Sequence, residues 1–299
     1  MTKKPKIIAV VGPTSSGKTA LAVELAKKNG GEIVSTDSRQ IYRGLDIGAG
    51  KVTKREMQGV PHHLLDIANP KRTFSVAQYQ RQAKRVVADI IKRGKIPILC
   101  GGTGLYVDSI INDQAFPPVP PNTELRKKLG RLSTTELFKK LEKLDPARAS
   151  NIDPKNPHRL IRAIEIATTL GSVPVLIPTN SSYDTLIIGL SLPREQLQRR
   201  IHTRLLSRMR HGMVAEATRL HNNTLSWKRM EALGLDYRYL AQFLQRKITK
   251  IEMLQKIEKE NWLYAKRQMV WFKRNKNTMW FQPNDGRLVL DTVKKYLSK

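Results

Sequence analysis

The chain carries, directly after a short apolar run, the octapeptide Gly12-Pro13-Thr14-Ser15-Ser16-Gly17-Lys18-Thr19. This spacing of glycines, lysine and threonine fits the pattern in which backbone N–H groups turn inward around phosphate oxygens. Lys18 would supply a point charge, and the Thr19 hydroxyl would suit a magnesium ion. A helix that begins near Lys18 would add its positive dipole end. We therefore interpret the octapeptide as a P-loop, which predicts a phosphate-bearing ligand without specifying ATP.

The segments around the P-loop alternate between strand and helix patterns. Short apolar runs at 7–11, 33–34 and 96–100 predict buried strands. Helices are expected over 19–28 and over 75–93, where apolar residues recur at helical spacing. This alternation is typical of an α/β fold with a parallel sheet, and the P-loop makes it a P-loop NTPase-like core.

The pattern changes at the proline-rich stretch 117–121. Helical patterns follow it without a convincing strand, and a strand pattern returns at 187–192. We therefore expect a helical insertion domain at 117–182 within a catalytic core that combines 1–116 and 183–299. A basic helical C-terminal region is predicted within the second part of this core.

Polar segments follow two of the predicted strands. Asp37 comes after the strand at 33–34, and Gly101-Gly102-Thr103-Gly104 follows the strand at 96–100. Because ligands bind outside the carboxyl ends of strands in open α/β sheets, both segments are expected beside the P-loop. Asp37 would then suit a general base or a magnesium ligand. A helix N-cap at Asp37 and simple turn glycines at 101–104 remain open alternatives.

The charge of the chain is strongly positive. The 299 residues contain 54 Lys and Arg against 25 Asp and Glu, a formal net charge of +29. Such an excess repels itself in a compact fold and indicates a polyanionic partner, with nucleic acid as the leading candidate. An anionic membrane surface or a basic bias of the host proteome would also account for the charge.

Other features of composition narrow the class of protein. The single cysteine, Cys100, excludes a disulfide within the chain and fits a buried, reduced thiol. No apolar stretch approaches the length of a membrane span, and the N-terminus carries no signal-like apolar region. We expect a cytoplasmic monomer that does not enter a membrane.

Six segments in this order resemble the bacterial tRNA dimethylallyltransferases, also called tRNA isopentenyltransferases. They are the P-loop, Asp37–Gly44, Val60–Leu64, Gly101–Tyr106, Arg159–Glu165 and Tyr264–Gln268. The resemblance spans about residues 6–274, and the run that begins Asp37-Ser38-Arg39-Gln40 beside a P-loop is its most specific part.

The resemblance implies transfer of a dimethylallyl group from dimethylallyl diphosphate to the exocyclic amine of the adenine just 3′ of a tRNA anticodon. Asp37 would accept a proton from the amine, while Lys18, Thr19 and Mg²⁺ would stabilise the leaving diphosphate in the P-loop. Arg204, in a looser match, would face the diphosphate. Contacts with tRNA are implied for Asp37, Ser38, Arg39, Gln40, Thr103, Arg126, His158, Arg159, Leu160, Ile161 and Arg162.

The helical spacing within 158–165 indicates a basic face independently of the resemblance. On a helix, one face would hold His158, Arg159, Arg162 and Glu165, and the opposite face would hold Leu160, Ile164 and Ala167. A basic helix face is commonly no more than solvated surface, but beside the other segments we favour RNA contact.

Two segments depart from the pattern of the family. Ala232-Leu233-Gly234-Leu235-Asp236-Tyr237 stands in place of the usual Ala-Ile-Gly-Tyr-Lys-Glu, and Ile47-Gly48-Ala49-Gly50-Lys51 in place of Ile-Gly-Thr-Ala-Lys.

Small-molecule kinases and enzymes that prenylate free adenine nucleotides are the alternative functions. Neither has an evident use for the high net charge.

Overall fold

The computed structural model describes residues 4–175 and 181–299. The chain forms two compact units, one of Met1–Asp113 with Asn180–Lys299 and one of Gln114–Thr179. The second unit corresponds to the predicted insertion at 117–182, with both boundaries three residues earlier.

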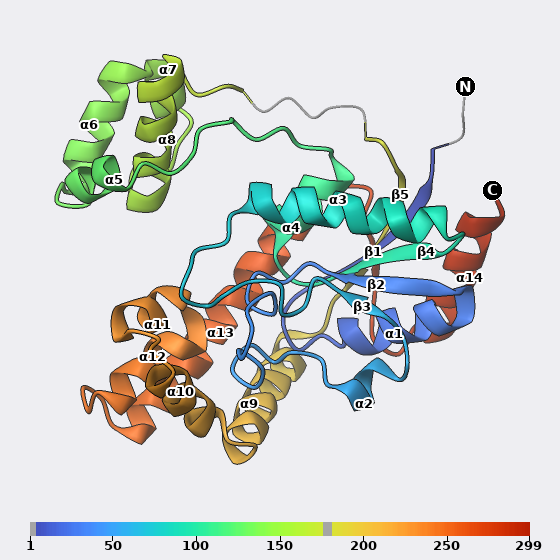
Figure 1. Ribbon diagram of the computed structural model, residues 1–299. Coiled ribbons are helices and arrows are strands. Elements are labelled where there is room, and N and C mark those ends of the chain that lie inside the picture. The colour runs from blue at the N-terminus through green and yellow to red at the C-terminus, as the bar shows by residue number, and fades with distance from the viewer. Residues whose placement is uncertain (1–3, 176–180) are drawn as a thin grey trace. The chain divides into compact units, whose positions relative to one another are not determined.

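A six-stranded parallel sheet forms the centre of the first unit (Figure 1). Its strands are β1 (Lys6–Val11), β2 (Gly31–Ser35), β3 (His62–His63), β4 (Ile96–Cys100), β5 (Asp184–Leu190) and β6 (Met279–Phe281). Their order in the sheet is β3-β2-β4-β1-β5-β6, and every pair is parallel. This confirms the predicted α/β fold with a parallel sheet. Because β1, β2 and β4 run parallel, the loops that follow them leave from the same edge of the sheet.

Helices cover both faces of the sheet (Figure 1). One face is covered by α3 (Val76–Lys92) and α4 (Gly104–Ile111), and α3 buries Ala83, Val87 and Ile90 completely. The other face is covered by α1 (Lys18–Asn29) and α14 (Gly286–Ser298). The strand β6 and the helix α14 had not been predicted, because they follow the long helical region and carry no motif.

The C-terminal region of the first unit is helical, as predicted. It contains α9 (Arg194–Arg210), α10 (Met213–Asn222), α11 (Trp227–Leu233), α12 (Leu235–Leu244) and α13 (Lys250–Phe272). A short helix, α2 (Lys54–Met57), precedes β3. The long helix α13 begins with a capping box in which Thr249 and Glu252 bond to each other's backbone N–H groups. In the described parts of the chain, no helix is both long and apolar enough to cross a membrane.

The second unit is built of helices around a small core of its own. They are α5 (Thr123–Leu129), α6 (Thr134–Leu144), α7 (Pro146–Ala149) and α8 (Pro157–Leu170). Leu137 and Leu141 of α6 pack with Leu160 and Ile164 of α8 in this core. The separate core explains why these residues form a unit by themselves.

Candidate active site

The P-loop connects β1 to α1 and adopts a conformation that its glycines permit. Gly12 has a φ of 141°, and a Cβ atom there would lie 2.5 Å from the carbonyl oxygen of Leu190. Gly17, directly before α1, has a φ of 99°. Both positions therefore require glycine. The N-terminal end of α1, which directly follows the loop, favours an anion.

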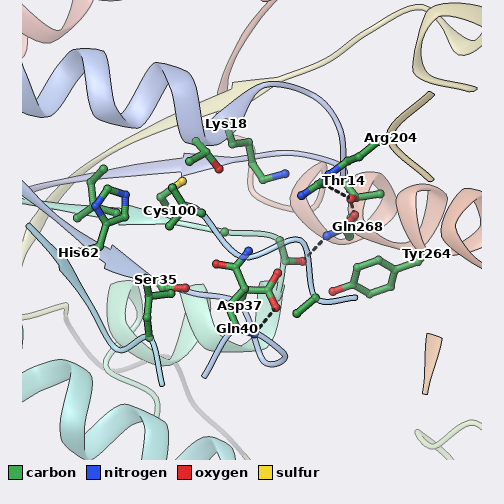
Figure 2. A pocket seen from close by; sticks show the side chains of 17 residues that line it. Thr14, Lys18, Ser35, Asp37, Gln40, His62, Cys100, Arg204, Tyr264 and Gln268 are labelled. Atoms are coloured by element: carbon green, nitrogen blue, oxygen red, sulfur yellow. Dashed lines mark hydrogen bonds between the residues drawn. The ribbon is translucent and has the colours of Figure 1, made fainter. Parts of the chain in front are cut away.

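Loops from three strand ends meet at one pocket of about 640 Å³, part of it open to solvent (Figure 2). The lining residues from these loops are Thr14, Lys18 and Thr19 after β1, Asp37 and Gln40 after β2, and Gly101 and Gly102 after β4. The structure thus brings the P-loop, Asp37 and the Gly101–Gly102 turn together, as the strand ends led us to expect. The other P-loop residues shape the loop and do not line this pocket; they are Gly12, Pro13, Ser15, Ser16 and Gly17.

Lys18 is the P-loop cation at the pocket. Its Nζ donates a hydrogen bond to the carbonyl oxygen of Pro13 at 2.5 Å. The pKa of Lys18 is lowered to about 8, mainly by burial and also by the positive charge of Arg204, while Asp37 opposes this effect. An anion bound beside Lys18 would stabilise its charged form.

Arg204 approaches the P-loop from α9. One guanidinium nitrogen donates to the Thr14 hydroxyl at 3.3 Å, and another donates to the carbonyl oxygen of Gly50 at 2.9 Å. Arg200, one turn earlier, lies near Gly17, where a Cβ atom would be 3.8 Å from its guanidinium. Cationic groups of α9 therefore converge on the P-loop, as the looser sequence match implied for Arg204.

Asp37 is held by the turn that follows β2. Its Oδ1 atom accepts hydrogen bonds from the backbone N–H groups of Arg39 at 2.8 Å and Gln40 at 3.3 Å. These bonds cap a turn, and no helix begins there. Asp37 lines the pocket, and its carboxyl group is displayed there (Figure 2). The fixed carboxylate is suited to accept a proton from a bound acceptor.

Two residues predicted to contact tRNA bond directly to each other beside Asp37. The Thr103 Oγ1 atom accepts from the Ser38 backbone N–H at 3.0 Å and donates to the Ser38 hydroxyl at 3.2 Å. Tyr264 of α13 contacts Thr103 and lines the pocket. Burial raises the pKa of Tyr264 to about 12, so its hydroxyl remains protonated at neutral pH.

The pocket also has an apolar wall. It is formed by Ile33, Ala49, Val52 and Leu65, with Cys100 and His62 beside them. Burial raises the pKa of the Cys100 thiol to about 11 and lowers the pKa of His62, so both groups are neutral at neutral pH. The pocket therefore combines cations for phosphate with a surface for an uncharged, apolar group.

Gln268 of α13 is a pocket residue to which sequence reasoning assigned no role. Its Oε1 atom accepts from the Thr14 backbone N–H at 2.7 Å, and its Nε2 atom donates to the Gly102 carbonyl oxygen at 2.8 Å. The segment Tyr264–Gln268 had been recognised as a motif, and this was the only signal for the residue in the sequence. Its contacts depend on packing between segments far apart in the chain.

In the second unit, Arg126 and Arg162 are paired with an acidic side chain. Glu165 is 1% exposed and accepts bonds from Arg126 at 2.9 and 2.7 Å and from Arg162 at 2.5 Å. Burial alone would raise the pKa of Glu165, but these guanidinium groups and the backbone N–H of Asn122 lower it. Arg162 and Glu165 share a face of α8, as the helical spacing indicated, but the carboxylate of Glu165 is buried and neutralised.

The predicted tRNA-contacting segment of α8 is only partly exposed. His158 and Arg159 are exposed, whereas Leu160 is fully buried in the core of the unit and Ile161 packs against that core. The side chain of Leu160 packs with Leu137 and Leu141, so the contact with tRNA implied for this residue, which stays a prediction, would have to be made by its backbone.

A parallel sheet with a P-loop, convergent cations and a carboxylate in one pocket defines a P-loop enzyme that acts on a phosphate-bearing ligand. A family model described as IPP transferase matches residues 40–275. The chain belongs to this family of tRNA prenyltransferases.

Relatives and solved structures match over almost the whole chain. A tRNA dimethylallyltransferase 2 of Treponema denticola is 44% identical over 278 residues, which cover 91% of this chain and 93% of the relative. A tRNA dimethylallyltransferase of Staphylococcus carnosus is 42% identical over 90% of this chain and 89% of the relative. The crystal structure of a tRNA isopentenylpyrophosphate transferase of Bacillus halodurans is 34% identical, with a TM-score of 0.75 over 99% of this chain and 97% of that chain.

Proposed function

We propose that the protein transfers a dimethylallyl group from dimethylallyl diphosphate to the N6 amine of the adenine that follows the anticodon of a tRNA. The products are N6-isopentenyladenine in the tRNA and free diphosphate. One observation carries the choice of donor: the same pocket presents Lys18 and Arg204 to a diphosphate and an apolar wall to a short hydrocarbon group. Family membership supports the choice of acceptor.

The reaction replaces a carbon–oxygen bond with a carbon–nitrogen bond. The N6 amine attacks the allylic carbon, the bond to the diphosphate oxygen breaks, and the diphosphate leaves with the bonding electrons. Asp37 takes the proton from the nitrogen. Its position fits this role, because it lies beside the Ser38–Thr103 pair, which is assigned to contact with the tRNA. Lys18, Arg204 and the backbone N–H groups of the P-loop stabilise the negative charge that develops on the leaving diphosphate.

The residues at the P-loop fit Mg²⁺. This ion prefers oxygen ligands and keeps several waters, so it is bound by few protein groups together with substrate phosphates. Thr19 lines the pocket, and the second carboxylate oxygen of Asp37 is not used by the turn bonds made through Oδ1. Thr19 would hold the ion, which would supply positive charge to the diphosphate.

We further propose that tRNA is bound electrostatically by a monomeric protein in the cytoplasm. The net charge of +29 supports a polyanionic partner as large as a tRNA. Binding of a small nucleotide would not require such a high charge. Exposed cations of the second unit, such as Arg159, are candidates for contact with the RNA.

The deciding experiment is mass spectrometry of tRNA incubated with the protein, Mg²⁺ and dimethylallyl diphosphate. A tRNA nucleoside that gains one dimethylallyl group is the expected product. Prenylation of free adenine nucleotides without modification of tRNA would favour the nucleotide-prenylating alternative. Phosphorylation of a small acceptor by ATP would favour a kinase.

A further inference from the structure

Glu216 of α10 binds a loop of the active site although it lies outside the pocket. Its two carboxylate oxygens accept hydrogen bonds from three consecutive backbone N–H groups, those of Asp46 at 2.9 Å, Ile47 at 2.7 Å and Gly48 at 2.9 Å. A fourth bond comes from the Tyr237 hydroxyl at 2.6 Å. The residue is only 2% exposed. A buried carboxylate with four donors is held rigidly, and it fixes the loop to which it bonds.

The loop held by Glu216, residues 46–51, continues into the pocket. The carbonyl oxygen of Gly50 accepts one bond from Arg204 at 2.9 Å and one from the Gln40 side chain at 3.2 Å. Ala49 contributes to the apolar wall. The position of this loop therefore affects both the guanidinium that faces the P-loop and the surface offered to the hydrocarbon part of a ligand.

The two segments that depart from the family pattern meet at this loop. Tyr237 packs so closely on Gly48 that a Cβ atom there would lie 2.6 Å from the tyrosine ring. Arg208 donates to the Gly48 carbonyl oxygen at 2.9 Å and to Asp236 at 2.7 Å. At Gly50, a Cβ atom would lie 2.3 Å from the Arg204 guanidinium. The departures at 47–51 and 232–237 thus belong to one structural assembly.

We propose that Glu216, supported by Tyr237, is a positioning residue for donor binding: it holds the loop 46–51 so that Gly50 orients Arg204 toward the P-loop. This inference rests on the proposed function, since it assigns a diphosphate to the site that Arg204 faces. Glu216 does not line the pocket, and it acts through the backbone of the loop. Its effect should be larger for the donor than for tRNA, because the loop bonds to Arg204 at the P-loop, whereas on the acceptor side its bond is to the Gln40 side chain.

The test compares Glu216→Gln with Glu258→Gln, a half-buried glutamate of α13 that contacts only His202 among the ion pairs described. The amide has one acceptor oxygen and places an NH₂ group against backbone donors, so the loop loses part of its support. Binding of magnesium pyrophosphate is measured by calorimetry, and the Michaelis constants for dimethylallyl diphosphate and tRNA are measured separately. For Glu216→Gln we expect pyrophosphate affinity to fall about tenfold, with a matching rise in the donor constant. The tRNA constant should stay within about twofold, and Glu258→Gln should resemble wild type in every measurement.

Tyr237→Phe decides the question if Glu216→Gln does not fold, because it removes one hydroxyl and leaves the three backbone bonds. We expect it to weaken pyrophosphate binding about threefold, as for the loss of one hydrogen bond. Unchanged pyrophosphate affinity in the folded variants would overturn the inference, as would an equal loss for donor and tRNA, which would indicate a general structural role. Absence of prenyl transfer by the wild-type protein would refute the proposed function instead, and the pyrophosphate measurements would still stand.

Discussion

The side chain of Gln268 accepts a hydrogen bond from the backbone N–H of Thr14 at 2.7 Å, across 254 positions of the sequence. The same carboxamide donates to the Gly102 carbonyl oxygen. Gln268 therefore joins the P-loop, which we assign to the donor, to the loop that precedes Thr103, which we assign to the acceptor. It is also in close contact with Gly102, where a Cβ atom would lie 1.9 Å from Nε2.

Gln268→Ala should raise the Michaelis constant for dimethylallyl diphosphate about tenfold and also lower kcat, because both loops lose one buried hydrogen bond. Steady-state kinetics with each substrate varied in turn measures the effect. Gln255→Ala, an exposed glutamine of the same helix, is the matched control. Normal kinetics in Gln268→Ala would show that the two loops hold their positions without this bridge.

Asp37→Asn should reduce transfer by roughly 100-fold or more, the usual scale for losing a positioned base. The amide oxygen can still accept from the Arg39 and Gln40 backbone N–H groups, so the turn should persist. Affinity for tRNA is therefore expected to remain within a few-fold of wild type. Single-turnover kinetics and filter binding measure the two quantities, and near-normal turnover would remove Asp37 from the mechanism.

Lys18 should make donor binding depend on pH. Its pKa in the ligand-free protein is lowered to about 8, mainly by burial, so the ammonium loses its proton as the pH rises through that value. Since a bound diphosphate favours the charged form, affinity for pyrophosphate should fall about tenfold between pH 7 and pH 9 and should be constant below about pH 7.

Lys18→Arg provides the control for this titration, because a guanidinium stays charged over the whole range. The ratio of wild-type to variant affinity removes any titration of pyrophosphate itself. A ratio that does not change with pH would contradict the lowered pKa of Lys18. Lys18→Ala should bind the donor very weakly at every pH.

The core of the site could be predicted because local sequence determines it. The P-loop, Asp37 and the glycines at 101–104 each follow a strand, and parallel strands place their carboxyl ends at one edge. Helical periodicity likewise located α3 within one residue at each end of the predicted 75–93.

The support of the site could not be predicted in the same way. Gln268, Glu216 and Arg208 bond to backbone groups of distant loops, and such pairs leave no periodicity or spacing in the sequence. The burial of Glu165 could not be predicted for a related reason. A helical wheel shows which residues share a face, but it does not show that the arginines on that face neutralise a buried carboxylate.

The ion pairs of Glu165 change how tRNA binding must be tested. Replacing only Arg126 and Arg162 by alanine would leave a buried carboxylate without its partners, which costs about 3–5 kcal/mol in comparable cases. Weaker tRNA binding by that double variant could then result from unfolding of the second unit. The triple variant Arg126→Met, Arg162→Met, Glu165→Gln avoids this, because the Gln oxygen can still accept from the Asn122 backbone N–H.

If Arg126 and Arg162 contact tRNA phosphates, the folded triple variant should bind tRNA more weakly and with less dependence on salt. Each lost phosphate contact should flatten the slope of log affinity against log salt concentration by roughly 0.7–0.9, and the Michaelis constant for dimethylallyl diphosphate should not change. Lys294→Ala with Lys295→Ala, two exposed cations of α14, removes two positive charges outside the second unit. Equal slopes for the triple variant and wild type would show that these arginines serve only to neutralise Glu165, and RNA contact by this unit would then depend on residues such as Arg159.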